Sequence, residues 1–240
     1  GAALAELDGL PRRRWLPSPP PALLLPAGEA ALAALAAAGA LPFSCKWKVA
    51  AADDRLERQV LERLLLRLPP GSRLRLDANG GWKLPTALAW AERLQGEACL
   101  EWIEQPLDPL DHRGLAELQS RCPRLPLALD EALLECPGLR ARWDGWQECR
   151  PGQEGDPRPL LAELERGRPR LMVSTSFETG IARRWLHHLA ALQAAGPTPV
   201  APGLAPGWQA AGGLASADPA LVWRAAGQAA GVMHAAQSCR

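Results

Sequence analysis

Tyrosine is absent from this 240-residue chain, phenylalanine occurs only twice and histidine only four times. The scarce histidines and the lack of a Cys-x-x-Cys pair argue against a zinc site of the usual spacing. Tryptophan, in contrast, occurs ten times, scattered along the chain. We interpret the tryptophans as packing residues, apart from Trp47 and Trp82, which adjoin candidate site residues.

An excess of one charge is also missing, since 27 basic and 26 acidic residues leave a net charge of +1. This balance gives no electrostatic reason to expect a nucleic acid or an anionic membrane as a partner. No apolar run approaches the roughly 18 residues of a membrane span, and we expect no signal peptide. The six cysteines lack metal-site spacing and several lie in apolar stretches, so we expect free thiols in a reducing, cytoplasmic compartment.

Alternating apolar strands and helical segments fill most of the chain. The predicted strands cover residues 41–50, 73–79, 98–105, 126–131, 146–151 and 170–176. The predicted helices cover residues 27–39, 54–68, 85–94, 111–120, 133–141, 159–166 and 181–195. This alternation is typical of an α/β protein with parallel strands, and the length suits a barrel of about 200–250 residues. Residues 1–26 carry too many prolines for a regular element, so we interpret them as a connection.

Three acidic residues recur at the carboxyl ends of successive predicted strands. Asp77 precedes Glu104 by 27 residues, and Glu104 precedes Asp130 by 26 residues. One strand, one helix and two loops take about that many residues, because parallel strands need a helical crossover of about a dozen residues or more. Carboxylates at the strand ends of a barrel converge on its carboxyl-terminal face and repel one another unless a cation joins them. All-oxygen ligands favour Mg²⁺, with Mn²⁺ close behind.

Further polar residues lie at the ends of the same series of strands. Lys46 and Lys48 share one face of a strand that comes one βα unit before Asp77. The other candidates at strand ends are Asn79, Glu131, Arg150, Ser174, Thr175 and Ser176. A metal bound to a substrate carboxylate stabilises the charge left when the adjacent carbon loses a proton. A lysine beside a metal and a second lysine has its pKa lowered and becomes a usable base.

These motifs, in this order and spacing, closely resemble the o-succinylbenzoate synthase family of the enolase superfamily. The segments that carry the resemblance are KWK at 46–48, LDANGGW at 76–82, EWIEQPLDPLD at 101–111, LALDEAL at 127–133 and STSFETGIA at 174–182. The resemblance runs from about Leu10 to the end of the chain. It implies a (β/α)7β TIM-like barrel preceded by an α+β capping domain.

The resemblance also implies a reaction and roles for residues. Mg²⁺ would be held by the three acids at 77, 104 and 130, with Glu131 as their supporting neighbour. The reaction would be the syn dehydration of 2-succinyl-6-hydroxy-2,4-cyclohexadiene-1-carboxylate to o-succinylbenzoate in menaquinone or phylloquinone biosynthesis. Lys48 would move the proton and Lys46 would tune it. The residues expected to bind the substrate are Asn79, Ser174, Thr175, Ser176, Gly203 and Leu204.

Two features depart from the family pattern. The family usually has Lys-Pro on the strand where this chain has Arg150-Pro151. Arginine stays charged and cannot act as a base, but it can stabilise an anionic intermediate as a cation. The chain also begins with Gly1, and we expect residues 1–26 to be a remnant of the capping domain and linker. The barrel would then cover residues 27–215, and a C-terminal segment at 216–240 would pack on the barrel or cap.

Alternative interpretations remain open at this point. The chain could be an N-acylamino-acid racemase or dipeptide epimerase of the same superfamily, or a truncated relative without activity. Arg150 could be a surface residue of a loop, and Thr175 or Ser176 could cap the next helix. As partner we expect a small-molecule carboxylate substrate and neither nucleic acid nor membrane. A syn dehydration needs one base whereas racemisation needs two, and this favours the lyase.

Overall fold

The computed structural model describes residues 15–238 and divides the chain into two compact units. The sheet unit comprises residues 21–148 and 170–172. The second unit comprises, among the described residues, 15–20, 149–169 and 173–238. The predictions for residues 1–14, for residues 239–240 and for the thiol of Cys239 lie outside the described residues.

A seven-stranded sheet forms the centre of the sheet unit, and its strands neighbour one another in chain order. The strands are β1 Leu23–Leu25, β2 Ser44–Lys48, β3 Arg73–Asp77, β4 Leu100–Glu104, β5 Leu127–Leu129, β6 Trp146–Cys149 and β7 Leu171–Val173. The pairs from β1 to β6 are parallel, as predicted. The last residue of β6 and the last residue of β7 belong to the second unit.

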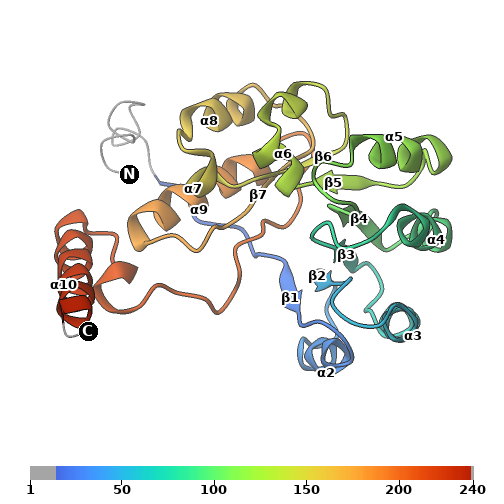
Figure 1. Ribbon diagram of the computed structural model, residues 1–240, viewed down its shortest axis with the longest axis horizontal. Helices are drawn as coiled ribbons and strands as arrows, with labels where there is room; N and C mark the ends of the chain where they lie inside the picture. The colour runs from blue at the N-terminus through green and yellow to red at the C-terminus, as the bar shows by residue number, and fades with distance from the viewer. Residues whose placement is uncertain (1–14, 239–240) are drawn as a thin grey trace. The chain divides into compact units, whose positions relative to one another are not determined.

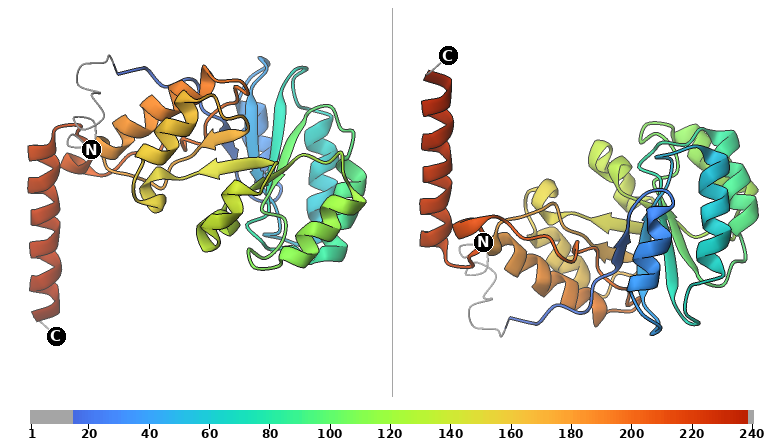
Figure 2. Two further views of the ribbon diagram at one scale, coloured as in Figure 1. Left: turned by 90° about the horizontal axis from the view of Figure 1, so that it is seen from above. Right: turned by 90° about the horizontal axis from the view of Figure 1, so that it is seen from below.

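Helices fill the crossovers between these strands. They are α2 Ala30–Ala37, α3 Asp54–Leu65, α4 Leu84–Leu94, α5 His112–Arg121, α6 Glu131–Glu135 and the 3₁₀ helix η2 Pro137–Ala141. Helices α3, α4 and α5 lie along one face of the neighbouring strands (Figures 1 and 2). Because side chains alternate along a strand, Leu74 and Leu76 pack in the core while Asp77 points to the opposite face. The polar positions of the strands are thereby kept away from the helices.

Local sequence signals explain where these helices begin. The side chain of Asp53 caps α3 by accepting hydrogen bonds from the backbone N–H groups of Arg55 and Leu56. Asp111 caps α5 in the same way, at 2.8 Å from the Gly114 nitrogen. Each cap satisfies N–H groups that have no partner inside the helix. The helices therefore start directly after the loops that follow β2 and β4, which fixes those loops.

Two expectations about the sheet unit need correction. Residues 23–25 form strand β1, which pairs with β2, although we expected no regular element before residue 27. Pro21 and Pro26 flank this run without interrupting it, so three leucines remain free to join the edge of the sheet. The predicted helix at 133–141 consists of two elements, because Pro137 cannot continue α6 and instead begins η2.

The second unit contains the helices α7 Pro151–Glu154, α8 Arg158–Glu165, α9 Gly180–Ala194, η3 Gly212–Ala215 and α10 Pro219–Ser238. Ser174 and Gly203 form a parallel bridge, which stands where an eighth strand would lie in the predicted barrel. Helix α10 contacts η3 and α9. No helix within residues 15–238 is long and apolar enough to cross a membrane. The five described cysteines are free thiols, as expected.

Candidate metal centre and active-site residues

The carboxyl ends of β3, β4 and β5 bring the three predicted acids to one edge of the sheet. Asp77 is the last residue of β3 and Glu104 the last residue of β4, and the register places them opposite each other. Asp130 follows β5 directly. All three side chains are buried, with exposed fractions of 7%, 0% and 2%. The repeat of one acid per βα unit therefore corresponds to neighbouring strand ends.

A fourth carboxylate, Glu148 on β6, lies among these buried acids and was not predicted. Oxygen atoms of Glu104, Asp130 and Glu148 all lie within 4.8 Å of one another. Asp77 is not part of this group, although the sequence predicted it as a ligand. Glu148 lies two residues before Arg150, so the strand period would place both on one face. We missed this signal because few apolar residues mark that strand.

Lys46 on β2 extends its ammonium group between the carboxylates. Its Nζ atom is 2.8 Å from Glu104 Oε1 and 3.1 Å from Asp77 Oδ2. The same atom is 3.7 Å from Glu148 Oε2. Burial acts to lower the pKa of Lys46, but the three carboxylates outweigh it and hold the pKa well above its ordinary value. These carboxylates therefore favour the protonated form of Lys46, whose ammonium group lies among them as a cation.

Three of the four carboxylates lie within 4 Å of this one ammonium group, and Asp130 lies beside Glu104 and Glu148, so the edge of the sheet carries excess negative charge. Burial raises the pKa of Glu104 well above its ordinary value, the charge of Glu148 raises it further, and Lys46 acts to lower it. A divalent cation would relieve this repulsion, and the group contains only carboxylates, which are hard oxygen donors. Oε2 of Glu131, next to Asp130, is also buried and makes no hydrogen bond within residues 15–238. The residues present fit a divalent metal ion.

Lys48 differs from Lys46 in its surroundings. The two side chains lie on the same face of β2, but Lys48 is exposed and stands at the strand's carboxyl end. Its register partner is Asp77. An exposed lysine at this end can reach a small molecule, whereas the ammonium of Lys46 is held among carboxylates. The two lysines of the predicted pair are therefore suited to different tasks.

Hydrogen bonds between loops support the acids. Asn79 Nδ2 donates to Glu131 Oε1 at 2.9 Å, which joins the loop after β3 to the start of α6. Gln105, which is buried, joins the loops after β4 and β5. Its Oε1 accepts hydrogen bonds from the backbone nitrogens of Asp130, at 3.3 Å, and Ala132, at 3.1 Å. These links position Asp130 through its own backbone. No role for Gln105 was predicted from the sequence.

The remaining predicted residues lie in the second unit. Arg150 Nη1 donates to the carbonyl oxygen of Thr175 at 3.2 Å, so Arg150 is tied into the fold. Thr175 Oγ1 donates to Glu178 Oε2 at 2.6 Å, and Ser174 Oγ donates to the carbonyl oxygen of Gly203 at 3.1 Å. The first hydroxyl group stabilises the turn after β7, and the second joins the end of β7 to the segment at Gly203. Ser176 Oγ is buried without a hydrogen bond among the described residues.

The alternative role of Thr175 or Ser176 as a helix cap is not found. Helix α9 begins at Gly180, and its cap position is Thr179, whose side chain makes no capping hydrogen bond. Leu204, predicted to bind substrate, is buried, and its carbonyl oxygen accepts a hydrogen bond from Arg183 Nη2 at 3.0 Å. The roles of these residues toward a substrate stay predictions.

Comparisons with known proteins agree with this arrangement. Residues 28–141 match the family described as enolase C-terminal domain-like. The o-succinylbenzoate synthase of Thermosynechococcus vestitus is 37% identical over 153 residues, which are 60% of this chain and 47% of that enzyme. The o-succinylbenzoate synthase of Mycobacterium tuberculosis is 42% identical over 60 residues, or 25% of this chain and 18% of that enzyme. The chain thus matches about half, or less, of the length of these relatives.

Solved structures show the same fold. A crystal structure of o-succinylbenzoate synthase from Thermosynechococcus elongatus, complexed with Mg in the active site, has a TM-score of 0.69 and 32% identity. That match covers 85% of this chain and 65% of the other. MenC from Desulfotalea psychrophila has a TM-score of 0.64 and 24% identity, over 81% of this chain and 56% of the other. This second likeness concerns the fold alone. The α/β architecture predicted from the sequence is thereby confirmed.

Proposed function

We propose that this chain, a relative of the o-succinylbenzoate synthases with the α/β fold of the enolase superfamily, carries the catalytic site of a Mg²⁺-dependent dehydratase. The observation that carries the proposal is the set of buried carboxylates around Lys46, with the exposed Lys48 at the same strand end. Excess buried negative charge calls for a divalent cation, and a lysine beside it supplies a base. The names of the relatives support the choice of reaction.

The substrate in this proposal is 2-succinyl-6-hydroxy-2,4-cyclohexadiene-1-carboxylate and the product is o-succinylbenzoate. Bound Mg²⁺ would stabilise the negative charge that develops on the substrate carboxylate when the adjacent carbon loses its proton. Glu104 and Asp130 would hold the ion with Asp77, the third ligand implied by the resemblance, and Glu148, whose oxygen lies within 4.8 Å of theirs, is the alternative third ligand. The product would serve menaquinone or phylloquinone biosynthesis.

Lys48 performs the proton transfers in this proposal. Its Nζ takes the proton from the carbon next to the carboxylate and returns it to the hydroxyl group on the same face, which leaves as water. The C–H and C–O bonds break, and the ring becomes aromatic. Lys46 anchors the carboxylates through its ammonium group, which lies within 4 Å of three of them. One base is enough for a syn elimination.

A racemase or epimerase is the second candidate, and the residues support it less. Such an enzyme needs a base on each face of the substrate, and at the position of the family's second lysine this chain has Arg150. Arginine keeps its proton at any working pH. A racemase would exchange the α-proton of an N-acylamino acid with solvent D₂O without loss of water, and we expect no such exchange.

Turnover of the cyclohexadiene substrate tests the proposal. We expect product formation with Mg²⁺ and none with EDTA, and Lys48→Ala should lower kcat by about 10²–10⁴-fold because the general base is lost. Lys83→Ala is the matched control, since Lys83 is an exposed lysine outside the site, and its rate should be unchanged.

Two outcomes would contradict the proposal. A folded chain that binds Mg²⁺ but forms no product would overturn catalysis by this chain. A chain that binds no divalent ion, measured by calorimetry, would overturn the metal centre itself. Circular dichroism of each variant separates both outcomes from a failure to fold.

A further inference from the structure

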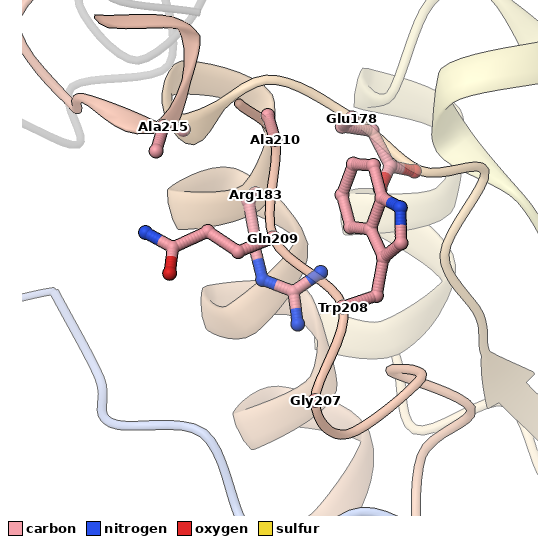
Figure 3. Close-up of a pocket in the computed structure, with 8 residues that line it drawn as sticks. Glu178, Arg183, Gly207, Trp208, Gln209, Ala210 and Ala215 are labelled. Carbon is pink, nitrogen blue, oxygen red and sulfur yellow. The ribbon is translucent and has the colours of Figure 1, made fainter. Parts of the chain in front are cut away.

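A cavity of about 300 Å³ lies in the second unit, apart from any residue assigned above to metal binding or proton transfer. Helix α9 and the residues before it contribute Arg183 and Glu178, and the loop that precedes η3 contributes Trp208 and Gln209 (Figure 3). This volume is at the lower end for a small-molecule site. The cavity is therefore suited to a small ligand.

Arg183 is the cation of this cavity, and only part of its hydrogen-bonding capacity is used. Its Nη2 donates to the carbonyl oxygen of Leu204 at 3.0 Å, which fixes the plane of the guanidinium group. Its Nη1 is buried and makes no hydrogen bond within residues 15–238. The guanidinium carbon lies 5.7 Å from the centre of the Trp208 ring. A buried charged donor without an acceptor is costly, so an acceptor supplied by a ligand would be favourable.

Glu178 does not serve as that acceptor: its two carboxylate oxygens accept hydrogen bonds from other donors, and Arg183 Nη1 bonds to neither of them. Oε2 accepts the hydrogen bond of Thr175 Oγ1 at 2.6 Å, and Oε1 accepts that of the Ser176 backbone nitrogen at 2.6 Å. Its negative charge nevertheless faces the cavity. A ligand with one negative charge therefore meets less repulsion than one with two charges on a single group, such as phosphate.

We infer that this cavity binds the carboxylate group of a small organic acid. Arg183 would bind the carboxylate through its free Nη1, since a planar guanidinium matches carboxylate geometry. The ring of Trp208 would cover the aliphatic part of the acid, and the Gln209 amide offers a further polar contact. The acid is either a free metabolite or the succinyl arm of a larger molecule. The second source alone rests on the proposed function.

Calorimetric titration of the full chain with succinate in EDTA tests the inference without the metal centre. We expect Arg183→Gln to weaken binding by about 10–100-fold, because a hydrogen bond to a charged group is lost. Arg183→Lys keeps the charge, so its affinity for succinate should lie between those of the parent chain and Arg183→Gln. Arg184→Gln is the matched control: Arg184 is the next residue of α9, is exposed, and lies over Trp15 at 4.4 Å. It should bind like the parent chain.

A second variant keeps the test decisive if Arg183→Gln does not fold. Trp208→Leu changes a half-buried loop residue and should weaken succinate binding several-fold while the far-ultraviolet dichroism is unchanged. Equal affinities of the parent chain, Arg183→Gln and Trp208→Leu would overturn the inference. So would the absence of binding up to about 10 mM succinate. Tighter binding of inorganic phosphate than of succinate would overturn the assignment to a carboxylate.

Two further ligands distinguish the sources of the carboxylate. Binding of o-succinylbenzoate that depends on Arg183, with benzoate unaffected by Arg183→Gln, would identify a succinyl arm as the occupant. Dependence on Arg183 for free succinate alone would identify a separate organic acid. Both results support the cavity as a carboxylate site. Each can be obtained even if the chain shows no dehydratase activity.

Discussion

The strand ends of the sheet unit and the turn after β7 in the second unit use their polar side chains in different ways. At the ends of β3, β4 and β6, buried carboxylates face one another and share the ammonium of Lys46. After β7, the hydroxyl of Thr175 bonds to Glu178 of the same turn, and the hydroxyl of Ser174 bonds to the carbonyl oxygen of Gly203. The first arrangement concentrates charge that a ligand can neutralise, whereas the hydroxyls of Ser174 and Thr175 already have protein partners.

This difference separates residues that bind a ligand from residues that hold the fold. A buried cluster of groups with the same charge destabilises the folded protein. Such a cluster is tolerated where a bound cation compensates its charge. A hydroxyl group with a satisfied hydrogen bond needs no ligand. Substitutions should therefore change metal affinity in the sheet unit and stability in the turn.

We expect the greatest change from Glu104→Gln. Glu104 is fully buried and bonds to Lys46 at 2.8 Å, so the variant removes a central charge of the acidic group. Mg²⁺ affinity should fall by more than the 10–100-fold typical of a supporting residue, and dehydratase activity should be lost. Calorimetry with Mg²⁺ measures the affinity. Glu92→Gln, on the exposed side of α4, is the control and should bind as before.

Glu148→Gln should weaken Mg²⁺ binding by about 10–100-fold, whether Glu148 binds the ion directly or supports a ligand. The reason is its place in the group of oxygens within 4.8 Å of one another. Titration of Asp77→Asn in parallel compares the unpredicted acid with the predicted one. An unchanged Mg²⁺ affinity in Glu148→Gln would mean that this carboxylate only neutralises Lys46.

Thr175→Val should lower the free energy of unfolding by about 1–3 kcal/mol, because it leaves an oxygen of buried Glu178 without its donor. Mg²⁺ affinity should stay the same, which is the contrast with the acids. Chemical denaturation measures the first quantity and calorimetry the second. Thr179→Val, which loses no capping hydrogen bond, should change stability by less than about 0.5 kcal/mol.

The smallest loss of stability is expected for the exposed ion pair of Glu62 and Arg93. Hydrogen bonds from Arg93 hold the pKa of Glu62 below its ordinary value. The pair therefore stabilises the protein above the unfolded pKa of 4.5, and this contribution is lost as the pH falls through the lower folded value. Solvent screens the pair, so Glu62→Gln should cost about 0.5 kcal/mol or less at pH 7. A similar cost at pH 3 would contradict this origin.

The sequence predicted the parts of the fold that follow from periodic spacing. The sequence separations between Asp77, Glu104 and Asp130 each correspond to one βα unit. The structure places these residues at three adjacent strand ends. Strand β1 was not predicted, because three leucines next to prolines carry little periodic signal. Its conformation depends on pairing with β2. Tertiary contacts therefore determine the conformation of residues 23–25, which the local sequence does not specify.

The candidate site was predicted less completely than the fold. The sequence identified Lys46 and Lys48 as a pair, but spacing cannot show that one is buried among carboxylates and the other exposed. It missed Glu148, whose position depends on the register of a strand with few apolar residues. The hydroxyl of Thr175 was predicted to contact the substrate. Only the three-dimensional structure reveals its hydrogen bond to Glu178 within the turn.

The amide of Gln105 has a consequence for ion size. Gln105 is the residue next to Glu104, and its Oε1 accepts hydrogen bonds from the backbone nitrogens of Asp130 and Ala132, so it links the ends of β4 and β5. The distance between the two carboxylates then cannot widen freely to admit a larger ion. Ca²⁺ needs ligands at about 2.3–2.6 Å in a yielding shell, whereas Mg²⁺ accepts a tight, regular one. A single buried amide would thus make the centre discriminate between the two commonest divalent cations of the cell.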